Sequence, residues 1–202
     1  MRLDHIAYRV KDRKKTAQFF IDAMGYRIQT EFDLEFSDGT TTKCIALEPP
    51  EKPLKENFID VYSKEQLNLN WTLWQDWFGI INQSIKGKYH PGVTYHLAPE
   101  IFVSDGEPDS IVGKWVAARN NIGGIHHVAY QVKSVESTMK RWKEQGYAEF
   151  ASENPLTCPG LTQVFTKPSE LLGIIIELIE RGEHGFCKDN VKALMESTKD
   201  NK

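Results

Sequence analysis

The sequence predicts an α+β fold in which two βαβββ modules lie side by side and form one open barrel around a metal site. The first observation behind this prediction is an internal repeat. Residues 3–10 read LDHIAYRV and residues 125–132 read IHHVAYQV, so His, Ala, Tyr and Val recur at an offset of 122 residues. The register continues, because Thr16 aligns with Thr138 and Phe20 with Trp142. A repeat that keeps its register in this way indicates a duplicated structural unit.

The second observation is the order of elements, which is the same after each copy. In the first copy a strand at 3–10 is expected from alternating apolar residues. A helix over about 12–24 is expected from apolar residues at three- and four-residue spacing, and Gly25 follows where a C-cap glycine belongs. Extended segments are then expected at 26–36, 41–47 and 93–104.

The second copy shows the same succession. A helix is expected over 134–145, with Val135, Met139 and Trp142 on its apolar face and Gly146 after it. Extended segments are expected at 148–152, 161–167 and 173–180. We therefore predict a first module at 1–108, a second module at 109–185 and a closing helix within 186–202, which carries Val191, Leu194 and Met195.

Residues 49–92 do not fit the repeat and are interpreted as an insertion in the first module. Within it, Trp71, Trp74, Trp77 and Phe78 predict a short helix over 70–81. Its aromatic face fits packing against the sheet better than it fits a binding lid.

Composition excludes several classes of protein. The chain has 202 residues and a net charge of −3 without a basic cluster, so a nucleic-acid partner is not expected. No apolar run reaches the roughly 18 residues that a membrane span needs, so we expect no membrane partner. The first residues lack the apolar core of a signal peptide, and the three cysteines are too scattered for a disulfide framework. A cytoplasmic protein, monomeric or homodimeric, is therefore expected.

Alternation along the strands brings candidate metal ligands together. His5, Ala7 and Arg9 share the inner face of the first strand, and His127, Ala129 and Gln131 share that of its repeat. Near the end of the chain Glu177 stands between Ile175 and Ile179 on one strand face, where an unpaired carboxylate is costly to bury. Two repeat-related histidines and this carboxylate predict a divalent-metal site.

Each of these residues has an alternative interpretation. His126 is the alternative to His127 as the second metal ligand. In a regular strand, however, His126 shares a face with Val128 and Tyr130, which is the helix-facing side. Glu177 could face solvent on an edge strand. Arg9, if it does not bind a substrate carboxylate, could be a solvated charge at the barrel rim.

The sequence resembles the vicinal oxygen chelate superfamily over nearly the whole chain except 49–92. The segments 3–7, 109–115 and 124–129 look like those of methylmalonyl-CoA epimerases. The segments LTQVFTKP at 161–168 and IELIER at 176–181, followed by Gly185-Phe186 and NVKAL at 190–194, look like the catalytic domain of 4-hydroxyphenylpyruvate dioxygenases. The resemblance implies that His5, His127 and Glu177 bind the metal and that Gln163, Phe165 and Phe186 line the substrate pocket.

The sequence also departs from both kinds of relative. The dioxygenases have glutamine where this chain has His126, glutamines on the helix that matches 110–116, and phenylalanine where this chain has Val191. The epimerases have a fourth ligand near the position of Phe102 or Ser104, neither of which is a good ligand. Glu100 or His96 could replace that ligand only with a shift of register.

These comparisons predict a non-haem Fe(II) dioxygenase-like enzyme that acts on a small α-keto acid or a related oxygen-chelating substrate, with dioxygen as co-substrate. Gln163, Phe165, Phe186, Gln131 and Arg9 are the predicted substrate-binding residues. The alternative is an epimerase, isomerase or lyase that uses Co(II), Mn(II) or Zn(II), with Glu100 as a weak candidate base. A non-catalytic binding protein of the same fold is a third possibility.

Overall fold

The structure is a computed structural model that describes residues 2–50, 98–182 and 187–199. The chain divides into two compact units, one made of Met1–Pro50 with Pro99–Lys202 and the other of Glu51–Ala98. Nearly all of the second unit, including the helix expected over 70–81, lies outside the described residues. The account below concerns the first unit.

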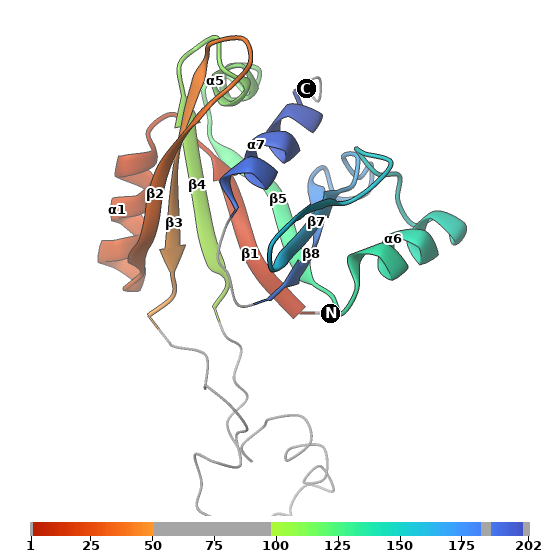
Figure 1. The fold of residues 1–202 in the computed structure, drawn as a ribbon. Helices are drawn as coiled ribbons and strands as arrows, with labels where there is room; N and C mark the ends of the chain where they lie inside the picture. Colours follow the sequence, from red (N-terminus) through yellow and green to blue (C-terminus); the bar gives the residue numbers. More distant parts are fainter. Residues whose placement is uncertain (1, 51–97, 183–186, 200–202) are drawn as a thin grey trace, which may run out of the picture. The chain divides into compact units, whose positions relative to one another are not determined.

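The described part of this unit contains eight strands and four helices (Figure 1). In chain order they are β1 (Arg2–Arg9), α1 (Arg13–Met24), β2 (Arg27–Glu35), β3 (Thr41–Glu48), β4 (Glu100–Gly106), α5 (Ile111–Ala117), β5 (Gly124–Gln131), α6 (Val135–Glu144), β6 (Leu156–Cys158), β7 (Leu161–Phe165), β8 (Ile175–Arg181) and α7 (Lys188–Ser197). None of these helices is long and apolar enough to cross a membrane.

The sheet confirms the predicted α+β fold built from a repeated unit. Its strand order is β2-β3-β4-β1-β5-β8-β7-β6, which is symmetric about the central pair β1 and β5. That central pair is antiparallel, whereas β1 with β4 and β5 with β8 are parallel. A two-fold operation therefore relates β1 to β5 and β4 to β8. The module boundaries at 108 and 185 remain predictions.

Local sequence signals set the helix ends. Helix α1 begins after Asp12, whose side chain accepts a hydrogen bond from the backbone N–H of Lys15, and ends at Gly25 with φ of 75°. Gly146 follows α6 with φ of 67°. Both glycines therefore occupy the left-handed conformation that favours glycine after a helix, as expected.

One expected strand is wrong. The segment 148–152 forms only an isolated bridge between Phe150 and Thr166, and the strand that follows the helix is the short β6 at Leu156–Cys158. The polar run Ser152–Asn154 bends the chain, so that the segment leaves the sheet before the strand begins. Polar residues of this kind favour turns over strand pairing.

The closing helix α7 lies between the two halves of the curled sheet (Figure 1). It contacts β2 and β6, which are the two edge strands of the sheet, and so both edges must approach the same helix. Val191 and Met195 of α7 pack with Ala7 and Phe102 on the inner face, while Leu194 packs with Phe165 and Ile175. Each such buried apolar side chain contributes about 1.5–3 kcal/mol. Helix α7 is thus part of the core that surrounds the inner face.

Candidate metal centre

Three neighbouring strands bring the predicted metal ligands together. His5 lies on β1, His127 on β5 and Glu177 on β8. His5 is opposite Ala129, and Ala129 is opposite Glu177, so the register places all three side chains on one face of the sheet. Their exposed fractions are 2%, 9% and 1%. Glu177 is therefore not a solvated carboxylate on an edge strand.

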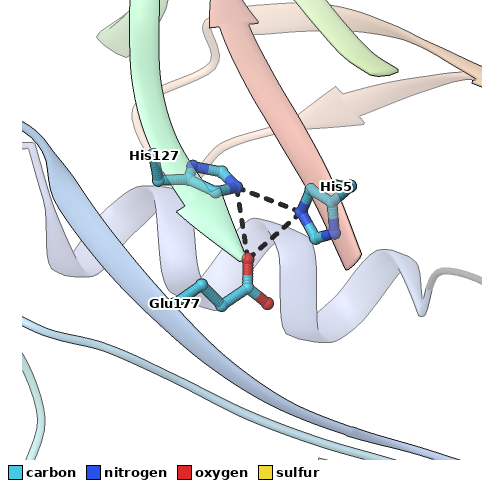
Figure 2. Close-up of side chains that lie close together, drawn as sticks. All are labelled: His5, His127 and Glu177. Atoms are coloured by element: carbon cyan, nitrogen blue, oxygen red, sulfur yellow. Dashed lines mark hydrogen bonds and ion pairs between the residues drawn. The ribbon is translucent and has the colours of Figure 1, made fainter. Parts of the chain in front are cut away.

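The side-chain atoms of these residues form a nearly equilateral triangle (Figure 2). His5 Nε2 lies 3.2 Å from His127 Nε2, and Glu177 Oε2 lies 3.2 Å from each of these nitrogens. Ligands bound at about 2.1 Å are about 3.0 Å apart in octahedral geometry and about 3.4 Å apart in tetrahedral geometry. The observed spacing lies between these values, so the three residues can hold one divalent ion.

The electrostatics of the triangle also suit a cation. Burial raises the pKa of Glu177, but the charges and hydrogen bonds of His5 and His127 outweigh burial and hold that pKa well below its usual range. Burial lowers the pKa of His5, whereas Glu177 and Asp4 together raise it to about 9. Burial lowers the pKa of His127. The site therefore concentrates a carboxylate charge beside two nitrogen ligands, as divalent-metal sites do.

A pair of β-bulges brings one further residue of each repeat to the site. Along the β1–β5 pairing, Leu3 is opposite Tyr130 and His5 opposite Ala129, so Asp4 is an extra residue on β1. Ala7 is opposite His127 and Tyr8 opposite Ile125, so His126 is an extra residue on β5. A bulge breaks the two-residue alternation of a strand.

The bulges overturn the expected orientation of His126. Regular alternation along the strand predicted that His126 faces the helix side. This prediction is wrong, because His126 lines the same cavity as His127. His126 Nδ1 lies 2.9 Å from His127 Nδ1, and Asp4 Oδ1 accepts a hydrogen bond of 2.8 Å from His5 Nδ1. Asp4 and His126 occupy equivalent positions in the two repeats, and each contacts the outer nitrogen of the candidate ligand that follows it.

Asp4 is itself fixed by a long-range ion pair that the sequence analysis missed. Arg181 Nη2 donates to Asp4 Oδ1 at 2.7 Å, and Arg181 Nε donates to Asp4 Oδ2 at 2.8 Å. Arg181 Nη2 also donates to Glu100 at 3.1 Å. Asp4 stands directly before a repeated histidine, which is the sequence signal that could have identified it. A carboxylate on the outer nitrogen of a metal-binding histidine fixes the ring orientation and the tautomer.

We expect Asp4→Asn to lower divalent-metal affinity by about 10- to 100-fold, the usual effect of losing such a partner. The asparagine loses the charge that holds both His5 and Arg181. Asp33→Asn is the matched control, since Asp33 is exposed on β2. Calorimetric titration with Co(II) or Zn(II) measures both variants, and equal affinities would show that Asp4 does not position His5.

Gln163 supports Glu177 from the neighbouring strand β7. Its Nε2 donates to Glu177 Oε1 at 2.6 Å, and its Oε1 accepts from Asn190 Nδ2 of helix α7 at 3.3 Å. The side-chain amide is thus engaged by two protein groups in this structure. Gln163 also lines the cavity, and its predicted contact with substrate stays a prediction.

The ligands lie at one cavity of about 20 Å³, which has room for about one water molecule, so a larger ligand can enter only if lining side chains or helix α7 move. Of the predicted substrate-binding residues, Arg9, Gln163 and Phe165 line this cavity. Gln131 and Glu100 are not in its lining, and Glu100 is instead paired with Arg181. Phe186 lies outside the described residues. Arg9 is 2% exposed, so the interpretation of Arg9 as a solvated rim charge is wrong.

The two-fold symmetry shows which residue stands where a fourth ligand would be. Glu177 on β8 is opposite Ala129, and its counterpart on β4, opposite Ala7, is Phe102. Phe102 and Ser104 both line the cavity, as the sequence analysis expected for this position. Phenylalanine has no donor atom for a metal, and Ser104 Oγ donates to the backbone oxygen of Tyr8. Among the residues that the structure describes, only His5, His127 and Glu177 form a ligand cluster.

Comparison with known proteins agrees with this architecture. The sequence model of the Glyoxalase/Bleomycin resistance protein/Dioxygenase superfamily matches residues 2–177. The chain belongs to this superfamily. No curated protein matches the sequence.

Several solved structures share the fold at low sequence identity. A crystal structure of methylmalonyl-CoA epimerase has a TM-score of 0.55 at 18% identity, over 91% of this chain and 97% of that one. The methylmalonyl-CoA epimerase of Mycobacterium tuberculosis has a TM-score of 0.55 at 17% identity, over 90% of this chain and 88% of that one. A mutant 4-hydroxymandelate synthase from Streptomyces coelicolor has a TM-score of 0.66 at 16% identity, over 98% of this chain and 53% of that one.

Proposed function

We propose that this superfamily member is a non-haem Fe(II) dioxygenase-like enzyme that acts on a small α-keto acid or a related oxygen-chelating substrate. The observation that carries the proposal is the set of two histidines and one carboxylate with Phe102 at the symmetry-related fourth position. Three protein ligands leave about three coordination positions open, which is typical of Fe(II) oxygenases. The carboxylate and carbonyl oxygens of a keto acid are donors that such an ion would bind.

The residues of the chain would have distinct roles in this reaction. His5, His127 and Glu177 would hold the ion, which would supply Lewis acidity and the electrons for dioxygen reduction. Asp4 and Gln163 would keep His5 and Glu177 in position through the hydrogen bonds described above. Phe165, whose ring lies 4.6 Å from that of His127, would pack on the apolar part of the substrate. Helix α7 would exclude water.

Epimerase, isomerase or lyase chemistry with Co(II), Mn(II) or Zn(II) is the second candidate. The two epimerase structures support it, because this chain matches 97% and 88% of their own length, against 53% of the synthase. Such chemistry needs a general base at the substrate proton. Glu177 is the one carboxylate in the described cavity lining, and Glu100 is bound to Arg181 outside it. This arrangement favours the oxygenase.

Metal analysis combined with two activity assays separates the candidates. Purified protein is assayed for bound metals, for oxygen uptake with a panel of α-keto acids and for exchange of substrate protons with solvent. We expect Fe(II)-dependent oxygen uptake. Proton exchange supported by Co(II) or Mn(II) without oxygen uptake would establish the second candidate. Absence of both activities with no metal retained would indicate a non-catalytic binding protein.

We also expect weak turnover of 4-hydroxyphenylpyruvate compared with keto acids that lack a phenol. Helix α5 has no glutamine, and α7 presents Val191, Leu194 and Met195 to the cavity. A phenol hydroxyl buried against these apolar α7 side chains has no partner there, which costs about 1–3 kcal/mol. Side-by-side oxygen uptake on 4-hydroxyphenylpyruvate, phenylpyruvate and aliphatic keto acids measures the preference. Fast turnover of the hydroxylated compound would contradict this prediction.

A further inference from the structure

Arg9 is a buried cation in the wall of the metal-site cavity. It lies four residues beyond His5 on the inner face of β1 and forms no ion pair with any carboxylate among the described residues. Among the described residues, Arg9 Nη2 donates a hydrogen bond of 3.1 Å to Thr198 Oγ1. A guanidinium has five N–H donors. Burying a charge without an opposite charge is costly, so a counter-ion is expected from a ligand.

The surroundings of Arg9 are positive and aromatic. The guanidinium carbon of Arg9 lies 5.8 Å from the ring centre of Trp115, and that of Arg119 lies 3.8 Å from the same ring. Burial and then the charge of Arg119 lower the pKa of Arg9 to about 9, so the guanidinium still carries its charge at neutral pH. This end of the cavity therefore attracts anions.

His126 provides a second unsatisfied group in the same cavity. Its Nε2 is buried and has no hydrogen-bond partner among the described residues, and the residue as a whole is 5% exposed. A histidine ring nitrogen can take part in one hydrogen bond, and His126 lines the cavity, so a ligand bound there could supply the missing partner of Nε2.

We propose that Arg9 and His126 form an anion subsite that binds a second acidic group of the substrate, while His5, His127 and Glu177 hold the metal that binds its keto-acid end. The substrate is then an α-keto acid with a distal carboxylate. This inference rests on the proposed function and names its substrate class. The Arg9 guanidinium donates hydrogen bonds and His126 Nε2 can donate one, so the two groups together suit a carboxylate.

Binding to the metal-loaded protein tests the subsite independently of turnover. Oxaloacetate, 2-oxoglutarate and 2-oxoadipate are titrated anaerobically by calorimetry, each against the straight-chain monocarboxylic keto acid of the same carbon number. We expect at least one dicarboxylate to bind about 10- to 100-fold more tightly than its partner, the range for hydrogen bonds to charged groups. Equal affinities across all pairs would overturn the proposal.

Variants separate an anion subsite from a tether for α7. Arg9→Met should remove the preference for the dicarboxylate and leave monocarboxylate affinity within about threefold, because it deletes only the charge-assisted bonds. Thr198→Val removes the Arg9 partner on the α7 side and should keep the preference.

We also expect Arg9→Met to unfold at the same or a higher temperature, since replacing a buried unpaired charge by an apolar side chain is often stabilising. If Arg9→Met lowers the affinities for the dicarboxylate and the monocarboxylate equally and also lowers the unfolding temperature, Arg9 is a structural tether for α7 and not part of an anion subsite.

The subsite and the proposed function can fail separately. Binding of 2-oxopentanoate depends on the metal centre, whereas binding of glutarate, which lacks the keto group, depends on the subsite. If glutarate binds in an Arg9-dependent manner and 2-oxopentanoate does not bind, the subsite stands and the oxygenase proposal fails. If the two members of every pair bind and react equally well, the oxygenase proposal stands and the subsite is overturned.

Discussion

Glu177→Gln, His5→Ala and His127→Ala are each expected to lower divalent-metal affinity by more than about 100-fold, since even the partners of metal ligands contribute about 10- to 100-fold. Each substitution removes one corner of a triangle whose edges are all 3.2 Å. The two remaining groups cannot complete a set of three ligands. Metal content after dialysis and calorimetric titration measure the loss.

Two further variants act as controls for this prediction. Glu100→Gln also neutralises a carboxylate, but Glu100 is outside the described cavity lining, so the variant should retain its metal. His126→Ala should also retain the metal with a modest loss of affinity, because His126 contacts His127 Nδ1 and not the triangle of ligand atoms. Complete loss of metal in His126→Ala with full retention in His127→Ala would show that the ligand assignment is wrong.

A chain truncated after Arg181 is expected to bind metal and to lose at least about 100-fold in turnover, a scale consistent with the sensitivity of catalysis to positioning and water exclusion. The truncation removes α7, whose Val191, Leu194 and Met195 line the cavity above the ligands. The ligand-bearing strands and their pairing partners β1, β4, β5, β7 and β8 all remain. Metal stoichiometry and steady-state kinetics measure the two effects.

A chain that ends at Lys199 is the matched control, since it keeps α7, and its turnover should be unchanged. Because α7 also packs in the core, the truncated chain is expected to be less stable than the full chain. Leu194→Ala therefore provides an independent test. It leaves the helix in place, is expected to lower stability by about 2–5 kcal/mol and opens the cavity beside Phe165. Full turnover in both the truncated chain and Leu194→Ala would show that α7 has no role in catalysis.

The fold was largely predictable because the sequence contains an internal repeat. The repeat at residues 3–10 and 125–132 predicted two equivalent strands, and these are β1 and β5 at the centre of the symmetric sheet. Alternation then placed His5 and His127 on one face, and the solitary carboxylate among isoleucines indicated Glu177. These inferences need only the period of a strand and the cost of burying a charge, both of which act locally along the chain.

Only the tertiary structure decided the orientation of His126 and the partners of the ligands. A strand keeps its alternation until a bulge adds a residue, and the bulges at Asp4 and His126 depend on how β1 and β5 pair across 122 positions. The ion pair of Arg181 with Asp4 joins residues 177 positions apart, and the burial of Arg9 depends on Thr198 at the far end of the chain. The alternation of residues along a regular strand predicts to which face of the sheet a side chain points. Which distant groups meet it depends on the packing of the whole chain, and here that packing gives Arg9 its hydroxyl partner at Thr198 and Asp4 its guanidinium partner at Arg181.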